Sequence, residues 1–246
     1  MNEETLKRNN KKNKEVKRQG LFITFEGPEG AGKSTHCAML SEWMTLMGVP
    51  VLTTREPGEG VVGGQIRRLI LNPENTTITP KTEALLYAAD RAQHVDEVLR
   101  PALDRGKVVV CDRYADSYLA YQGYGRGLDL TFLRQLNQMA TGGLQPDLTI
   151  LLDLDSEEGL ARVRARESSG DTARHTDRME REELAFHRRL RDGYRQLAAE
   201  TGRIKILDAG RGINEVKYEI RRLVSGLLLL RGFIDETNLD NEFFAR

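Results

Sequence analysis

The residues most suited to chemistry lie in one short segment near the start of the chain, Gly27-Pro-Glu-Gly-Ala-Gly-Lys-Ser34. The spacing GxxxxGK followed by Ser or Thr is typical of a phosphate-binding loop (P-loop), because the glycines let successive backbone N–H groups point into one concavity. An apolar strand pattern over 21–26 precedes it and a helical pattern over 34–47 follows it, and a helix N-terminus favours an anion. These flanking elements disfavour the alternative, an ordinary Gly-rich turn. The segment therefore predicts a nucleoside triphosphate site.

Side chains and backbone have separate predicted roles within this loop. Lys33, which we expect to be a solvent-facing charge, would bind the β- and γ-phosphates, and the Ser34 hydroxyl would ligate the Mg²⁺ that bridges them. Mg²⁺ is therefore the expected cofactor. The predicted nucleotide-binding residues are Gly27, Pro28, Glu29, Gly30, Ala31, Gly32, Lys33, Ser34 and Thr35.

Charged residues follow two further predicted strands. Arg55 comes directly after the strand predicted over 49–54, and Asp112 and Arg113 close the strand predicted over 107–112. Ligands of parallel sheets bind at the carboxyl ends of the strands, where these side chains must gather. Asp112 can hold a water of the Mg²⁺ shell, and Arg113 can neutralise the phosphoryl oxygens of an acceptor. Arg55 faces the same site, or alternatively pairs with an acidic neighbour.

A third acidic pair, Asp153 and Asp155, follows the strand predicted over 147–153. The order Asp-Ser-Glu-Glu before a helical pattern is better explained as a helix N-cap with acidic first-turn residues than as a metal site.

An aromatic and a cationic residue, Tyr87 and Arg91, are four positions apart in a helical pattern and so share one helix face. Such a pair could clamp a planar base. It is also common on helices, and alone it does not indicate a binding site.

The scaffold that positions these residues is predicted by alternating strand and helix patterns. Strand patterns cover 21–26, 49–54, 107–112, 147–153 and 203–208. Helical patterns cover 34–47, 64–71, 80–104, 115–122, 129–142, 156–167, 180–201 and 213–229. This alternation predicts an α/β fold, a parallel sheet with helices on both faces.

Composition limits the class of protein. The 246 residues are 39% hydrophobic and 30% charged, which suits one sizeable domain, placed here at 20–229. Lys+Arg and Asp+Glu both number 37, and a net charge of zero argues against a nucleic-acid partner held by bulk electrostatics. No apolar run has the length of a membrane span, and no signal peptide is recognisable. Two cysteines make no disulfide framework, so we expect a cytoplasmic protein.

The two ends of the chain are expected to differ from this domain. Residues 1–19 hold seven Lys or Arg and almost no apolar side chains, which predicts a disordered basic tail. Residues 230–246 form a C-terminal extension, whose apolar start could cover a dimer edge but more readily packs as the end of a helix.

Six segments in this order resemble the bacterial type of thymidylate (dTMP) kinases, and together they cover residues 21–208: FEGPEGAGKST, TREPG, LLYAADRAQH, DRYADSYLAYQGYGRG, PDLTILLDL and DRMEREELAFHRRLRDGYRQLA. The resemblance implies a P-loop nucleoside monophosphate kinase fold with a five-stranded parallel sheet and a lid. It also implies transfer of the γ-phosphoryl group of ATP to dTMP with Mg²⁺, and a homodimer. The alternatives are a kinase for dUMP or other pyrimidine monophosphates and a P-loop ATPase that is not a kinase. A GTP switch is disfavoured, because the chain lacks NKxD and DxxG.

The resemblance also assigns site residues. Tyr87 matches the base-stacking aromatic, where phenylalanine is usual, and Arg91 matches the thymine-bonding arginine. Tyr118 stands where many bacterial relatives carry serine, so that a bulky phenol lies near the base or the sugar. The full set of implied substrate-binding residues is Glu29, Arg55, Arg67, Tyr87, Arg91, Arg113, Ser117, Tyr118, Tyr121 and Gln122.

The lid is expected near 162–178, because the P-loop itself contains no arginine and the bacterial type supplies one from a mobile lid. Arg162, Arg164 and Arg166 precede a Ser-, Gly- and Thr-rich insert that contains Arg174. The insert is longer than is usual, so Arg166 and Arg174 are both candidates for the phosphate-reaching arginine. The predicted catalytic residues are Lys33, Arg113, Arg166 and Arg174, and the predicted metal ligands are Ser34 and Asp112.

Overall fold

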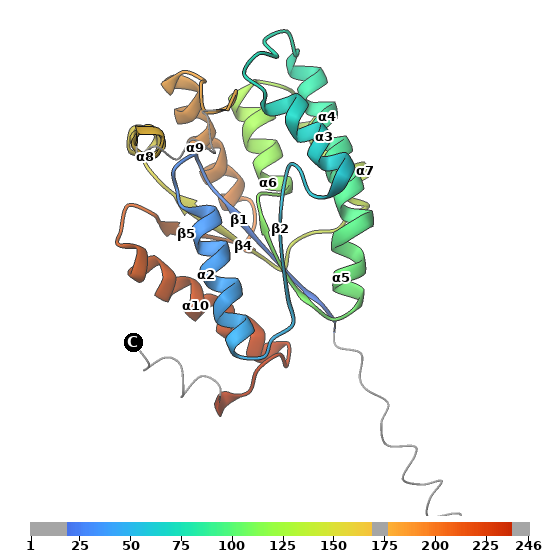
Figure 1. Ribbon diagram of the computed structural model, residues 1–246, viewed down its shortest axis with the longest axis vertical. Helices are drawn as coiled ribbons and strands as arrows, with labels where there is room; N and C mark the ends of the chain where they lie inside the picture. The colour runs from blue at the N-terminus through green and yellow to red at the C-terminus, as the bar shows by residue number, and fades with distance from the viewer. Residues whose placement is uncertain (1–18, 169–176, 238–246) are drawn as a thin grey trace, which may run out of the picture.

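The centre of the computed structural model, which describes residues 19–168 and 177–237, is a five-stranded sheet in the order β2-β3-β1-β4-β5 (Figure 1). All neighbouring strands are parallel, which confirms the predicted sheet. The strands are β1 (Leu21–Glu26), β2 (Val51–Arg55), β3 (Val108–Asp112), β4 (Leu148–Asp153) and β5 (Ile204–Asp208). Residues 1–18 of the predicted tail, 169–176 of the predicted lid and 238–246 of the predicted extension lie outside the described residues.

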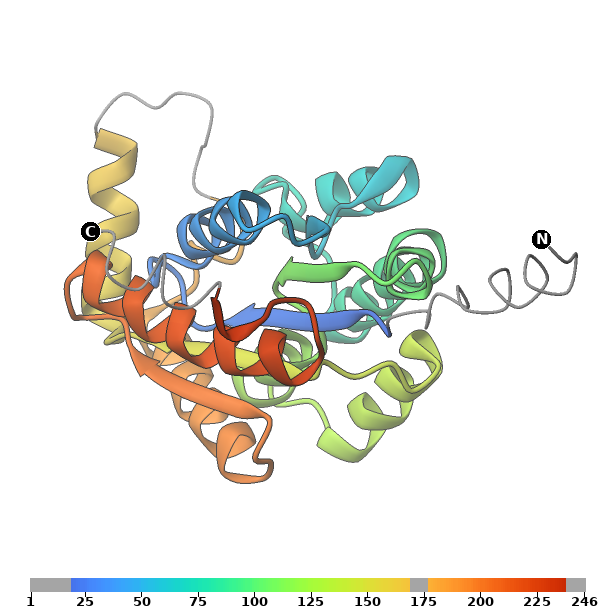
Figure 2. The same ribbon diagram turned by 90° about the horizontal axis from the view of Figure 1, so that it is seen from below.

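The side chains of β1 show how the sheet is covered. Leu21, Ile23 and Phe25 join one buried cluster with α2 (Lys33–Leu46) and α10 (Ile213–Leu230), whereas Phe22 belongs to a different cluster with Val109 and Tyr114. Successive side chains of a strand point to opposite faces, so β1 is buried on both, as in the middle of a parallel sheet. Figure 2 shows the strands between α2 on one side and α9 (Leu184–Ala199) on the other.

Local signals explain where several of the other helices begin. Thr79 Oγ1 accepts a hydrogen bond from the Thr82 N–H, with Pro80 at the first helical turn, and Asp129 Oδ1 accepts one from the Phe132 N–H. These helices are α3 (Gly60–Leu71), α4 (Pro80–His94), α5 (Arg100–Asp104), α6 (Ala115–Tyr118), α7 (Leu130–Thr141) and α8 (Ser156–Ser168).

The helix α8 begins as its sequence predicts. Asp155 Oδ1 accepts the backbone N–H groups of Glu157 and Glu158 at 2.9 and 3.4 Å, which confirms the N-cap interpretation. Asp153 has a different role, because its carboxylate pairs with Arg191 and with Arg195. This pairing ties the end of β4 to α9.

Two predicted helices are interrupted and one is shorter than expected. The helix predicted over 80–104 contains the π-helical turn η1 (Val95–Leu99), and that predicted over 115–122 continues as the π-helical η2 (Leu119–Gly125). The helix predicted from 180 begins at Leu184, because Asp177 accepts the backbone N–H groups of residues 179 and 180 and holds a turn there. Short π-helical turns are frequent at functional sites.

Residues that follow α10 pack on the same core. Phe233 and Ile234 are buried in the cluster that also holds Leu21 and Leu228. The apolar start of the predicted extension therefore packs against the end of this helix. Within the described segments, no helix combines the length and apolar character that crossing a membrane requires.

The P-loop and the first turn of α8 meet backbone to backbone. A Cβ added at Gly30 would lie 2.3 Å from the carbonyl oxygen of Gly159, and one added at Gly159 would lie 2.4 Å from that of Glu29. Gly30 also has a φ of 72°, a conformation that glycine adopts without steric cost. The two glycines therefore allow α8 to approach the loop.

We predict that Gly30→Ala lowers the free energy of unfolding by about 2 kcal/mol, since both the contact and the backbone angle oppose a side chain. Gly226→Ala is the matched control: it lies in α10, where an added Cβ meets nothing within 4 Å, and a helical Gly-to-Ala change stabilises by about 0.5–1 kcal/mol. Thermal unfolding followed by circular dichroism measures both. Equal melting temperatures for the two variants would contradict the contact.

Candidate functional site

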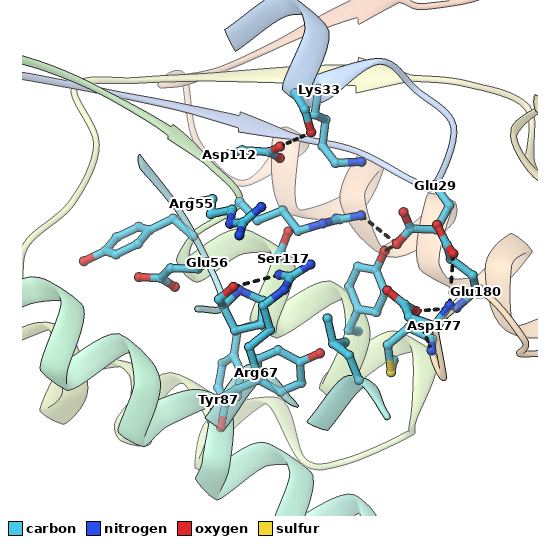
Figure 3. Close-up of a pocket in the computed structure, with 18 of the residues that line it drawn as sticks. Glu29, Lys33, Arg55, Glu56, Arg67, Tyr87, Asp112, Ser117, Asp177 and Glu180 are labelled. Carbon is cyan, nitrogen blue, oxygen red and sulfur yellow. Dashed lines mark hydrogen bonds and ion pairs between the residues drawn. The ribbon is translucent and has the colours of Figure 1, made fainter. Parts of the chain in front are cut away.

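An open cavity of about 810 Å³ lies at the carboxyl ends of β1, β2 and β3 and collects most of the predicted site residues (Figure 3). Those that line it are Glu29, Gly30, Gly32, Lys33, Ser34, Thr35, Arg55, Arg67, Tyr87, Arg91, Asp112, Arg113, Ser117, Tyr118, Tyr121, Gln122 and Arg166. Gly27, Pro28 and Ala31 belong to the loop but do not line the cavity, and Arg174 lies outside the described residues. Glu56, which follows Arg55 at the end of β2, and Arg162, one of the three arginines before the insert, also line it. Lining residues not proposed from the sequence include Pro57, Arg68, Leu71, Asn72, Tyr114, Asp177, Met179 and Glu180.

Lys33 is the cation of the P-loop, and the expectation that it faces solvent is wrong. Its side chain folds back into the loop, where Nζ donates to the carbonyl oxygen of Pro28 at 2.7 Å, and only 6% of the residue is exposed. Burial and the neighbouring Arg113 lower the pKa of Lys33 to about 8. The ammonium is therefore still mostly charged at neutral pH, and Lys33 lines the cavity.

Ser34 and Asp112 form an oxygen pair beside the loop. The Ser34 hydroxyl donates to Asp112 Oδ2 at 2.5 Å, while Asp112 Oδ1 is buried and has no hydrogen-bond partner in the described part of the chain. Within residues 19–168 and 177–237, no three or more His, Cys, Asp or Glu side chains gather to hold a metal. Mg²⁺ needs no such cage, because it keeps several waters and takes phosphate oxygens as ligands. A hydroxyl and an orphaned carboxylate oxygen therefore fit Mg²⁺ better than a transition metal.

Arg113 crosses the cavity from the end of β3. Its backbone has a φ of 70°, which only a few per cent of residues other than glycine adopt. The guanidinium donates from Nη1 to the carbonyl oxygen of Gly27 at 3.0 Å and from Nη2 to Glu29 Oε1 at 2.7 Å. The Arg113 charge therefore lies directly against the P-loop.

Glu29 balances part of this positive charge. Burial alone would raise its pKa, but Arg113 and Lys33 outweigh burial and lower it to about 2. The Tyr121 hydroxyl donates to the same Oε1 at 2.5 Å, and the Tyr121 ring lies 5.0 Å from the Arg113 guanidinium. Glu29 is therefore ionised at neutral pH and holds Arg113 and Tyr121 together.

Two other arginines have no such counter-ion. Among the described residues, neither Arg55 nor Arg67 has an ion-pair partner, and Arg67 donates only to the Pro57 carbonyl oxygen, at 2.7 Å. Burial and the Arg55 charge both lower the pKa of Arg67. The interpretation that Arg55 only pairs with an acidic neighbour is therefore wrong. Two adjacent guanidinium groups without carboxylates make a site for a phosphate.

Arg91 differs from these two because the protein already uses most of its donors. Its Nε donates to Glu56 at 2.8 Å, Nη1 to Asn137 at 2.9 Å and Nη2 to the Tyr114 carbonyl oxygen at 3.3 Å. Three of its five N–H groups are thus engaged, which leaves two for a ligand. The sequence did not indicate that Glu56, 35 residues away, would hold it.

Gln122 is oriented by a carboxylate that sequence reasoning missed. Gln122 Nε2 donates to Glu83 Oε1 at 3.0 Å. Burial would raise the pKa of Glu83, but hydrogen bonds and charge from Arg126 and Arg178 lower it, so Glu83 is ionised and can only accept. The amide nitrogen of Gln122 must therefore face Glu83, which leaves its oxygen as the acceptor available to a ligand.

Tyr118 lines the cavity with its ring 5.0 Å from the Arg91 guanidinium. Its hydroxyl is buried and has no hydrogen-bond partner among the described residues. Burial raises its pKa to about 12, so the hydroxyl stays neutral. A group of this kind ordinarily finds a partner, and a ligand in the cavity would supply one.

Two arginines of α8, Arg162 and Arg166, reach the cavity from the start of the predicted lid. Arg166 pairs with Glu180 at 3.0 Å, and Arg162 pairs with Glu158 at 2.6 Å and donates to the Ala209 carbonyl oxygen at 3.2 Å. Both line the cavity. Figure 3 shows Lys33 and Asp112 at one end of it, Tyr87 and Arg67 at the other, and Glu29, Asp177 and Glu180 along one side.

Comparison with known proteins gives one consistent result. A family model described as Thymidylate kinase matches residues 25–220. A thymidylate kinase of Syntrophotalea carbinolica is 50% identical over 213 residues, which cover 86% of this chain and 98% of that protein. One of Deinococcus radiodurans is 52% identical over 208 residues, covering 84% and 97%. The crystal structure of thymidylate kinase from Ehrlichia chaffeensis matches with a TM-score of 0.67 at 31% identity, covering 84% of this chain and 99% of that one.

Proposed function

The chain belongs to the thymidylate kinase family and is an ATP-dependent nucleoside monophosphate kinase, and we propose that the cavity described above carries γ-phosphoryl transfer from ATP to dTMP. The observation that supports this most is that one cavity joins a P-loop to a second cationic end at Arg55 and Arg67. A P-loop ATPase needs only the first of these. Two phosphate-binding ends suit a donor and an acceptor that meet between them.

At the donor end, the P-loop and Lys33 would hold the β- and γ-phosphates of ATP. Ser34 and Asp112 would hold Mg²⁺, which when bound neutralises charge on the phosphate oxygens. Arg113 lies where it can contact the transferred group, since its guanidinium is bonded to Gly27 of the loop. Phosphoryl transfer depends on positioning and charge stabilisation rather than on a covalent intermediate, and these groups supply both.

At the acceptor end, Arg55 and Arg67 would bind the monophosphate and Tyr87 would stack on the base. The Gln122 oxygen, fixed by Glu83, would accept the ring N–H of thymine, and the remaining N–H groups of Arg91 would donate to a base carbonyl. Uracil offers the same N–H, whereas cytosine presents a lone pair at this position. A kinase for dUMP or for pyrimidine monophosphates in general therefore remains the alternative to a strict dTMP enzyme.

We predict a definite order of acceptors. The dTMP reaction should have the highest kcat/KM, and dUMP should be roughly tenfold lower, because the 5-methyl group contributes about 1 kcal/mol. The dCMP reaction should be at least about 100-fold lower, because two acceptors would face each other at Gln122. Ribonucleotides and purines should react poorly, because Tyr118 and Tyr121 line the cavity and would leave less room for a 2′-hydroxyl or a larger base.

ADP release with ATP and a panel of dTMP, dUMP, dCMP, UMP, dGMP and AMP measures this order. Lys33→Ala, which lacks the phosphate-binding ammonium, controls for contaminating kinases. A purine or ribonucleotide that reacts better than dTMP would contradict the acceptor assignment. ADP formed equally fast without an acceptor would indicate an ATPase.

The arginine that reaches the phosphates from the lid is a separate proposal. We predict that Arg166→Ala lowers kcat at least about tenfold while changing the KM for ATP less, because the transition state spreads charge that the ground state lacks. Arg164→Ala, an exposed change on the same helix, is the control. Steady-state kinetics of both decide the matter. Near-normal kcat in Arg166→Ala together with a crippled Arg174→Ala would move the role to Arg174.

A cytoplasmic homodimer is the proposed state of the enzyme. The neighbouring helices α3 and α4 expose apolar side chains, with Val61 78%, Leu69 45% and Leu85 48% accessible, and such side chains gather at dimer contacts. Both cysteines are free and buried, which suits a reducing compartment. Light scattering should give the mass of two chains; the mass of one chain would rule the dimer out.

A further inference from the structure

Glu26, the last residue of β1, is a carboxylate that the proposed chemistry does not use. It is fully buried and does not line the cavity. Its Oε1 accepts the backbone N–H of Tyr114 at 2.8 Å, and its Oε2 accepts the Ser117 hydroxyl, with the Tyr194 hydroxyl 3.5 Å away. A buried carboxylate without partners is energetically unfavourable, and the three donors to Glu26 come from two parts of the chain, the segment 114–117 and Tyr194 in α9.

The first of these donors, the Tyr114 N–H, follows Arg113 directly and so bears on the Arg113 backbone. A left-handed conformation is sterically unfavourable for a residue with a side chain. The Arg113 N–H donates to the Phe25 carbonyl oxygen at 2.9 Å, and the next N–H, that of Tyr114, donates to Glu26. The end of β1 therefore holds the left-handed turn on both sides of its strained residue.

The other two donors, the Ser117 and Tyr194 hydroxyls, contact the guanidinium of Arg113. Its Nη1 lies 3.3 Å from the Ser117 hydroxyl and 3.2 Å from the Tyr194 hydroxyl, and these two hydroxyls lie 2.7 Å from each other. Both converge on Glu26 Oε2. The carboxylate thus reaches the backbone and the side chain of Arg113 through one intermediate group each, without touching the cavity.

We propose that Glu26 is a positioning residue for Arg113, acting through the Ser117 and Tyr194 hydroxyls and the Tyr114 backbone. An ionised carboxylate is the form that accepts from all three donors, whereas an amide would have to turn a donor toward one of them. Burial and the charge of Asp116 raise the pKa of Glu26 to about 7, so kinetics at pH 8 observe mainly the ionised form. The proposal rests on the proposed function only in that Arg113 contacts the reacting phosphates.

The test compares Glu26→Gln, Tyr194→Phe and the double variant at pH 8. Glu26→Gln should lower kcat/KM for dTMP about 10–100-fold, with the KM for ATP within about twofold of wild type. Tyr194→Phe should lower it about 3–10-fold, and the double variant should be no worse than Glu26→Gln, because both act on the same hydrogen bonds. Thr24→Val is the control: Thr24 is buried on β1 and bonded to Thr149 at 2.8 Å, but it has no contact with Arg113. Its dTMP kinetics should match wild type.

Three results would overturn the positioning role: a folded Glu26→Gln with normal dTMP kinetics, a rise in the KM for ATP as large as the loss in kcat/KM for dTMP, or fully additive effects in the double variant. If Glu26→Gln does not fold, Tyr194→Phe decides alone: a lower kcat/KM for dTMP with an unchanged KM for ATP supports the role, and wild-type kinetics overturn it. The wild-type enzyme is assayed first, so a failure to phosphorylate dTMP would refute the proposed function separately.

Discussion

Several cationic side chains share one partly buried cavity, and the arrangement of the residues around them depends on how the protein stabilises these charges. Bringing Lys33, Arg113, Arg91, Arg67 and Arg55 together costs desolvation and repulsion, as the lowered pKa values of Lys33 and Arg67 show. The protein compensates unevenly. Arg113 has Glu29 and Arg91 has Glu56, whereas the described part of the chain gives Arg55 and Arg67 no carboxylate. The uncompensated charge marks where phosphate is expected, and the compensated charge is fixed in place before any ligand arrives.

This division explains what the sequence could predict. The P-loop is a local pattern, and the strand-end positions of Arg55, Asp112 and Arg113 follow from any parallel sheet, so the fold and most lining residues could be predicted. The hydrogen-bond and ion-pair partners of these residues could not be predicted, because they come from distant parts of the chain. Glu56 lies 35 residues before Arg91, and Tyr194 lies 81 residues after Arg113. The burial of Lys33 was missed for the same reason, since its motif says nothing of the packing around the loop.

Glu83 shows how one missed residue connects two parts of the site. Besides Gln122 it accepts Arg178, whose backbone N–H donates to the Leu71 carbonyl oxygen at 3.1 Å and whose Nε donates to that of Ile70 at 2.8 Å. Arg178 is the last residue of the predicted lid at 162–178. This end of the predicted lid is therefore bonded to the end of α3 and to the same carboxylate that orients the Gln122 amide. A carboxylate with three cationic or amide donors cannot move toward one of them without weakening the others.

The helix α6 after β3 continues as the π-helical η2, and this change of helix type affects which of its side chains reach the cavity. Residues four apart share a helix face, so Ser117 with Tyr121, and Tyr118 with Gln122, form two adjacent rows, and all four side chains line the cavity. The π-helical turn η2 begins inside these rows, at Leu119, and widens the helix there. One row meets the P-loop through Glu29 and Arg113, and the other meets Glu83 and Arg91. A single helical segment thus contacts both the P-loop end of the cavity and the end that holds Glu83 and Arg91, and so fixes the distance between these two groups.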